Sequence, residues 1–373
     1  MFAARVLVFV LGAAVILNAL SSAIRTFIVP RGLPSTLTRW VFIAMRVFIL
    51  PFMSHRRPER QEVALAFMAP VGLLSLPIVW LASLLLGYTA IYWSLGASSW
   101  ATAFSISRLS LLYLGSNVGS LPGLPVFAFS ETVLSLLLAA ILVSYLPTIY
   151  AAFSQREASV TGLETRAGSP PTPLTMLTRY YKINGMDRIG EMWSEWQGWF
   201  EVVEETHTAL LPLLYYRSPQ PDRSWVTAAG AVLDTASITA SSLDRPRDPE
   251  AELCIRAGYL CLGRIAGAIG IPYNLDPSPT DPISVTQDEY DKVYEALKLI
   301  GVPMKPDRAQ AWRDFAGWRV NYDVALVALA ALTMAPPAPW SSDRVPQDKW
   351  KFLRSYSWSR EVAIAVAQGR SLR

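Results

Sequence analysis

The residue pair with the spacing of metal ligands is Glu204 and His207. A helix would place this Glu-x-x-His pair one turn apart on the same face, where both side chains could hold a ligand or a metal ion. The sequence of 373 residues has only one other histidine, His55, and two cysteines. Because no second histidine lies nearby, a solvated helix end is the favoured interpretation of the pair, and a metal site is the alternative.

Catalysis finds no support elsewhere in the sequence. Cys254 and Cys261 lie seven residues apart on one face of a predicted helix and are most simply small core residues. The glycines at 263, 267 and 270 lack the spacing of a phosphate-binding loop. No Ser-His-Asp set is evident. We therefore expect a protein that is not an enzyme and that has no cofactor.

Two charged residues, Arg108 and Glu131, interrupt strongly apolar sequence. A charge at membrane depth is costly and is typical of functional sites. Glu131 could pair with Arg108, lie behind a pore-lining segment and attract cations, or be a helix-start carboxylate at the membrane interface. Arg108 could alternatively line a path for anions. Both residues would lie in a vestibule if the segment between these apolar stretches lined a pore.

Charge is distributed unequally along the chain. Up to residue 173 there are 11 Arg, no Lys and 5 acidic residues, whereas the remainder has 22 basic and 24 acidic residues, which together give the net charge of +4. The first part has a lipid-facing composition and the second that of a soluble globular domain. This excludes a simple soluble enzyme, a secreted disulfide scaffold and a disordered protein. The basic pI of the chain comes from the apolar part, so orientation in a bilayer explains it better than nucleic-acid binding.

The first part contains four apolar stretches, at residues 2–22, 40–53, 63–95 and 125–153. A membrane crossing needs about 20 apolar residues, so we predict that the first, third and fourth stretches span. The second contains Arg46 and is too short, which favours an amphipathic helix lying at the membrane interface. Pro70 and Pro77 are expected to bend the third stretch.

The arginines predict how the chain is oriented. Those between the first and third stretches are Arg25, Arg31, Arg39, Arg46, Arg56, Arg57 and Arg60. Basic residues gather on the cytoplasmic side of membrane proteins, so this region and the C-terminal part are predicted to be cytoplasmic. The N-terminus and residues 95–125 then face outside, in a multi-pass protein of the plasma membrane that contacts membrane lipid.

The segment between the last two spans suggests a function. Residues 98–112 are compatible with a helix, and Gly115, Asn117, Gly119 and Pro122 then break it. A half-helix followed by irregular backbone is tolerated at membrane depth only when it is buried in protein or lines water. This is the arrangement of a re-entrant pore loop, and the alternative is an ordinary external loop that carries a short surface helix.

A span, the segment SISRLSLLYLGS and a second span that closes with YLPTIY resemble the pore module of tetrameric potassium channels. More narrowly, the chain is similar to bacterial relatives of two-pore-domain potassium channels that carry one such module and a helical cytoplasmic domain. SPQPDRSWVTAAGAVLDTA, from Ser218, and WRVNYD, from Trp318, also look like that group. The resemblance implies a homotetramer around one pore for K+ or Na+, and the helix kink at Pro147 and Thr148 could form a gate.

The same resemblance assigns a selectivity filter to Tyr113, Leu114, Gly115, Ser116 and Asn117. With Gly115 on the first glycine of the potassium pattern, Tyr113 takes the place of the threonine and Asn117 that of the second glycine. Potassium filters need that hydroxyl and glycines whose carbonyl oxygens point inward. We therefore expect a pore that discriminates weakly between cations.

Together these patterns predict an all-α membrane protein with three membrane-crossing helices, an interfacial helix, a re-entrant pore loop and an α-helical cytoplasmic domain. The expected divisions are residues 1–60, a pore domain at 61–157, a linker at 158–173 and the cytoplasmic domain at 174–373. Helices in the last are expected at 174–207, 225–242, 249–268, 287–299, 308–334 and 344–368. The expected function is a cation-conducting channel subunit with a regulatory domain. The alternatives are a non-conducting, membrane-anchored signalling or scaffold protein, or an anion channel.

Overall fold

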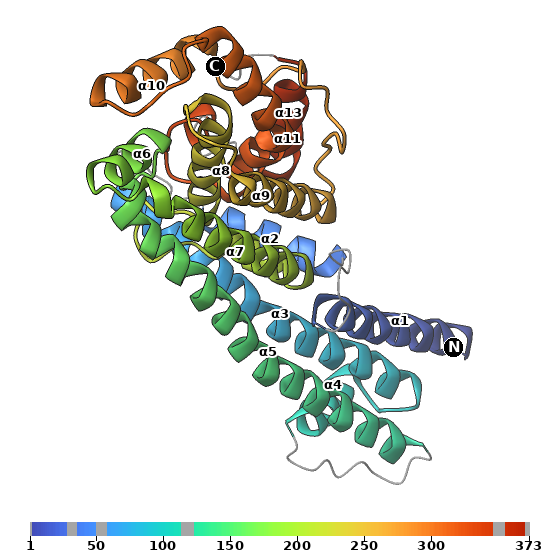
Figure 1. The fold of residues 1–373 in the computed structure, drawn as a ribbon. Helices are drawn as coiled ribbons and strands as arrows, with labels where there is room; N and C mark the ends of the chain where they lie inside the picture. The colour runs from blue at the N-terminus through green and yellow to red at the C-terminus, as the bar shows by residue number, and fades with distance from the viewer. Residues whose placement is uncertain (1, 28–35, 50–57, 113–122, 346–354, 370–373) are drawn as a thin grey trace. The chain divides into compact units, whose positions relative to one another are not determined.

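The computed structural model describes residues 2–27, 36–49, 58–112, 123–345 and 355–369 (Figure 1). Within these ranges the regular elements are helices, and the one extended pairing is an isolated bridge between Leu243 and Met304. The all-α prediction is therefore confirmed for the described part of the chain. The chain divides into two compact units, residues 1–48 with 67–151 and residues 49–66 with 152–373.

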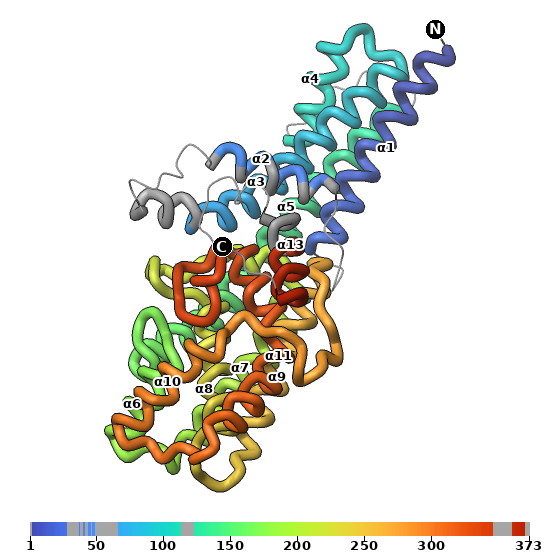
Figure 2. Tube along the Cα trace, turned by 90° about the horizontal axis from the view of Figure 1, so that it is seen from above, coloured from blue at the N-terminus to red at the C-terminus, as the bar shows by residue number. Residues whose placement is uncertain are grey.

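The helices of the first unit coincide in order with the predicted segments. They are α1 (Phe2–Phe27), α2 (Thr36–Ile49), most of α3 (Pro58–Ser94), α4 (Trp100–Leu111) and the first part of α5 (Leu124–Ala167). Their bounds differ most from the prediction at α2, which was predicted over 40–53, and at the ends of α1 and α5. α1 packs along α5 in the same direction, because Phe9 contacts Phe127 and Phe27 contacts Tyr145. α3 runs the opposite way (Figure 2). These directions agree with three successive crossings of a membrane.

α1 and α3 meet at a pair of glycines. A Cβ atom on Gly12 would lie 2.6 Å from the carbonyl oxygen of Gly87, so both positions need a residue without a side chain. Ten residues further along α1, the Trp80 indole N–H donates to the buried Ser22 hydroxyl at 3.0 Å. Small residues bring the backbones together, and this hydrogen bond fixes the register of the two helices.

Four of the described helices are long and apolar enough to cross a membrane: α1, the Ala66–Ser94 part of α3, α5 and α11 (Arg308–Thr333). The sequence predicts only the first three as spans. In α11, 72% of the most apolar window is buried within the protein, against 22–39% in the others. α11 thus packs its apolar surface against protein, whereas the other three leave most of theirs exposed.

α5 extends beyond its predicted end. The helix continues to Ala167, so only residues 168–172 stay outside a helix where we predicted a linker over 158–173. The reason is burial: Val160, Leu163 and Ala167 recur at helical spacing and enter the hydrophobic core of the second unit. The chain turns at Gly168, whose φ of +82° suits glycine.

The second unit is a helical bundle built around α11, which packs against α8, α9 and α13. Besides α11, its helices after α5 are α6 (Pro173–Lys182), α7 (Ile189–Ala209), α8 (Trp225–Ser242), α9 (Pro249–Ala268), α10 (Gln287–Ile300) and α13 (Ser355–Ala367). The predicted bounds of α8 and α9 are confirmed, because side chains at Ser224 and Asp248 cap their first turns. The single helix predicted over 174–207 is divided in two by the turn at Asn184 and Gly185.

A charged network lies at the centre of this bundle. The Arg319 guanidinium on α11 is fully buried and pairs with Asp234 of α8 and, at 2.6 Å, with Asp323 one turn along α11. It also donates to the carbonyl oxygen of Trp340 at 2.6 Å, and Tyr322 donates to Asp234 at 2.8 Å. Every charge in the network has a partner, as burial requires.

Candidate functional site

α4 is a short helix that turns back along α3. The Ser99 hydroxyl caps its first turn by accepting a hydrogen bond from the Thr102 amide at 3.1 Å. Eight residues after this cap, the Ser107 hydroxyl lies 3.1 Å from the carbonyl oxygen of Leu85, which precedes the last residue of α3 by nine positions. With a rise of about 1.5 Å per residue, α4 thus reaches back by about 14 Å along α3.

Glu131 ties α4 to both neighbouring helices. Its side chain, in the second turn of α5, is completely buried. The Ser107 hydroxyl of α4 donates to one carboxylate oxygen at 2.5 Å, and the Tyr92 hydroxyl of α3 donates to the other at 2.7 Å. A buried carboxylate needs such donors on both oxygens, because an unsatisfied one would be costly. The end of α4 is therefore fixed at a set depth between α3 and α5.

The two faces of α4 differ in character. Ala103, Ser107 and Ser110 recur at helical spacing and are buried, which lets the backbone of α4 approach its neighbours closely. The Thr132 hydroxyl of α5 donates to the Ser110 carbonyl oxygen at 2.9 Å. Phe104, at the flank of this face, is 42% exposed, and the opposite face carries the exposed Ala101, Ser105, Arg108 and Leu112. α4 is thus held by polar contacts on one face and has a mixed, partly polar surface on the other.

Arg108 is not a partner of Glu131 among the described residues. Its side chain is exposed, and its carbonyl oxygen accepts the amide of Leu112 where α4 ends. Of the three alternatives for Glu131, pairing with Arg108 is thus not formed among the described residues, and the other two stay predictions. The predicted filter residues, Tyr113 to Asn117, lie outside the described residues, where α4 leads.

The predicted gate residues lie within α5. Pro147 is exposed, and the neighbouring Thr148 hydroxyl donates back to the Ser144 carbonyl oxygen at 3.2 Å. Proline has no N–H, so the helix lacks one backbone hydrogen bond at this position. The helix is nevertheless continuous through the pair.

Glu204 and His207 do not converge on a common ligand. Glu204 pairs with Arg264 of α9 at 2.6 Å, while His207 is buried beside Arg156. Within the described part of the chain no three His, Cys, Asp or Glu side chains cluster in a way that could hold a metal ion. Both residues have protein partners, so the pair acts as two separate structural contacts.

Arg156, near the C-terminal end of α5, is fully buried in the second unit. Its guanidinium pairs with Glu157 at 2.7 Å and donates to the carbonyl oxygens of Leu213 at 3.1 Å and Tyr216 at 2.7 Å. It also donates to His207 Nε2 at 3.1 Å, so Nε2 must accept and Nδ1–H faces the Val203 carbonyl oxygen at 3.0 Å. Burial, and then the adjacent guanidinium, hold the pKa of His207 well below its ordinary value. This imidazole is neutral.

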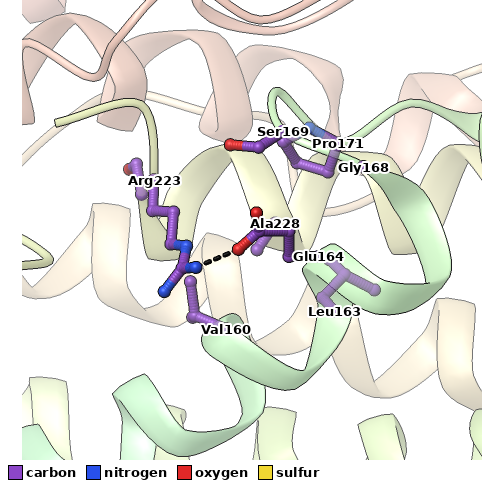
Figure 3. A pocket seen from close by; sticks show the side chains of 9 residues that line it. Val160, Leu163, Glu164, Gly168, Ser169, Pro171, Arg223 and Ala228 are labelled. Carbon is purple, nitrogen blue, oxygen red and sulfur yellow. Dashed lines mark hydrogen bonds and ion pairs between the residues drawn. The ribbon is translucent and has the colours of Figure 1, made fainter. Parts of the chain in front are cut away.

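The last turns of α5 make a further ion pair. Glu164 pairs with Arg223, and the two side chains border a cavity of about 10 Å³ that also contacts Ser169 (Figure 3). That volume is large enough for about one water molecule and for no larger ligand. The end of α5 is thus held by hydrogen bonds from Arg156 to carbonyl oxygens of distant residues and by the ion pair between Glu164 and Arg223.

The sequence pointed to Glu131 and missed its two partners, Tyr92 and Ser107. Tyr92 is one of several aromatic residues at the end of a predicted span, and nothing in its type marks it as a ligand of a carboxylate. Ser107 could have been found, because Ala103, Ser107 and Ser110 form a stripe of small residues in an otherwise bulky segment.

Comparison with known proteins adds no family. No family model matches the chain, and searches of the curated proteins and of the solved structures find no match either.

Proposed function

We propose that this chain is a subunit of an ion channel in which four copies surround one pore, conducting cations with weak selectivity. The observation that carries the proposal is the half-helix α4, which turns back between two candidate spans and is fastened there through the buried Glu131. An external loop on the membrane surface would need no carboxylate beneath it. A helix that enters the membrane from one side and stops there gives a re-entrant loop.

The direction of α4 favours cations. Its capped N-terminus lies next to the end of α3 and its C-terminus lies deeper, beside Leu85. Helix C-termini carry a partial negative charge of about half a unit, which in a membrane interior attracts cations. The positive charge of Arg108 in the last turn of α4 opposes this partial charge. Anion flux is therefore measured as well in the experiment that tests the proposal. One chain supplies one loop, so a filter requires about four copies.

The second unit serves as the regulatory domain in this proposal. α5 is one helix from Leu124 to Ala167, and its last turns belong to the core of that unit. Any change that turns or shifts the buried Arg156 therefore acts on the same helix that carries Pro147. A cytoplasmic signal would reach the gate through the helix itself.

Flux measurements on purified protein in liposomes test the proposal. We expect K+ and Na+ flux with a small difference between the two ions and little Cl− flux. Glu131→Leu should abolish cation flux, because it removes the acceptor for the hydroxyl groups of Ser107 and Tyr92 and releases α4. Glu205→Gln, which changes an exposed acid on α7, is the matched control and should conduct like the unaltered protein.

Three results would count against the proposal. A reversal potential that follows the Cl− gradient would show that the pore conducts anions, along a path at Arg108. A monomer or a non-annular dimer in mass photometry, without flux, would favour a membrane-anchored scaffold. Undiminished cation flux in Glu131→Leu would show that α4 does not hold the conducting segment.

A further inference from the structure

We infer that the second unit has a binding site for a small organic anion that carries an aromatic ring, in a groove between α9 and α11. The groove is lined by Arg247, Pro249, Glu252, Leu253, Arg256, Tyr259 and Trp318, and has a volume of about 520 Å³. Small-molecule sites typically have volumes of about 300–1,000 Å³, so the groove matches a ligand with one or two rings. Its lining residues all belong to the second unit and differ from those that contact the end of α5.

The first argument is an unused cation, Arg256. Four residues before it on α9 is Glu252, the position from which a helical residue would normally pair with it. Both oxygens of Glu252 are instead taken by Arg247, whose Nε and Nη2 each lie 2.6 Å away. Among the described residues no carboxylate forms an ion pair with Arg256, and its one side-chain partner is the Tyr259 hydroxyl. Its guanidinium therefore keeps most of its five N–H donors for a ligand.

The second argument is the aromatic surface beside that cation. Arg256 donates to the Tyr259 hydroxyl at 2.9 Å and lies 5.9 Å from the centre of its ring, which orients the guanidinium. Trp318 of α11 contributes a partly exposed indole, and Leu253 is 51% exposed. An indole and an aliphatic side chain bind a flat ring, while a guanidinium binds a carboxylate or phosphate through two parallel hydrogen bonds.

The aromatic side of the groove is built on rigid elements. Tyr259 and Trp318 lie in the middle of long helices that pack against each other in the core of the unit. Sites built on helices hold their geometry better than sites on loops. One chemistry, a ring with an oxyanion, fits the groove, and it occurs both in aromatic carboxylates and in nucleotides. Binding measurements can distinguish these two sources.

Calorimetric titration of the full chain in detergent tests the inference. The probes are indole-3-carboxylate and adenosine 5′-monophosphate, and acetate and inorganic phosphate are the ring-free comparisons. We expect one of the two ring compounds to bind in a 1:1 ratio and the ring-free ions to bind at least about tenfold more weakly, since these ions cannot stack on an aromatic side chain. Binding of the carboxylate alone or of the nucleotide alone identifies the source.

Two variants with opposite signs sharpen the test. Arg256→Gln should weaken binding by about tenfold or more, whereas Glu252→Gln should strengthen it, because it removes a negative charge and releases Arg247. Arg264→Gln is the matched control: it removes an arginine of the same helix that is paired with Glu204, and should leave the affinity unchanged. Melting curves confirm that each variant is folded.

The inference is overturned if neither ring compound binds, if phosphate or acetate binds as well as they do, or if Arg256→Gln and Arg264→Gln behave alike. The measurement needs no ion flux, so its outcome is independent of whether the pore conducts.

Discussion

Replacing Arg319 with methionine should strongly destabilise the second unit. The guanidinium lies between Asp234 and Asp323 with all three side chains at most 1% exposed. Methionine has a similar length and fills the space, so the main effect is electrostatic. Asp234 would keep the Tyr322 hydroxyl and Asp323 the amide and hydroxyl of Ser284, but neither would keep a cation.

The magnitude follows from these remaining contacts. Removing one partner of a buried ion pair costs about 3–5 kcal/mol, because the other charge stays buried without compensation. For a unit of this size about 1 kcal/mol shifts the melting temperature by about 2–4 °C, so we expect a decrease of about 6–20 °C. Tryptophan fluorescence is a suitable probe, since the Trp340 side chain is buried in the core of the second unit and becomes exposed on unfolding.

Two further variants separate charge from packing. Arg313→Gln removes an exposed arginine from the same helix and should change the melting temperature by little. Combining Arg319→Met with Asp234→Asn and Asp323→Asn should recover most of the loss, because no unpaired charge then remains. If the triple variant were as unstable as Arg319→Met alone, or if Arg319→Met melted like the parent, the electrostatic explanation would be refuted.

The other predictions concern pH, packing and topology. His207 is neutral in the folded protein because its pKa is lowered from 6.5, so its contribution to stability is complete above pH 6.5 and decreases by about 1.4 kcal/mol per pH unit below that pH. His207→Gln should therefore reduce the difference in melting temperature between pH 7.5 and pH 5.5, and an unchanged difference would contradict this. Gly258→Ala should lower the melting temperature, because the new Cβ would meet a leucine of α8 at less than van der Waals distance. Gly198→Ala, at a helical position with open space around it, should raise the free energy of unfolding by about 0.5–1 kcal/mol. Equal effects of the two variants would be inconsistent with this packing of α8 against α9. In intact cells Ser98→Cys, at an exposed position, should react with an impermeant maleimide, whereas Ser194→Cys should react only after permeabilisation. Both native cysteines are buried, so the parent protein should stay unlabelled. The reverse labelling pattern would show that the predicted topology is inverted.

Local chemistry determined much of the secondary structure. The bounds of α8 and α9 follow from capping residues and helical periodicity, which depend only on neighbours in the chain. The apolar stretches of α1, α3 and α5 are likewise recognised by length and the absence of charge. Glu131 was identified from the sequence as well, since a carboxylate within an apolar stretch needs a partner.

Only the tertiary structure decided which residues meet. Tyr92 and Ser107 contact Glu131 from separate helices, whereas the sequence offered Arg108 as one of three alternatives, because opposite charge is the partner that composition can suggest. The predicted end of α5 was wrong for a related reason. Glycine and proline indicate a break in a helix, but the burial of Val160 and Leu163 in a core formed by distant helices outweighs the low helix propensity of glycine in this segment. α11 is long and apolar enough to cross a membrane, although the sequence did not predict it as a span, and the surrounding helices, with Asp234 to pair with Arg319, bury it within protein. Partners brought together by folding are separated by tens of residues, and no local pattern encodes them.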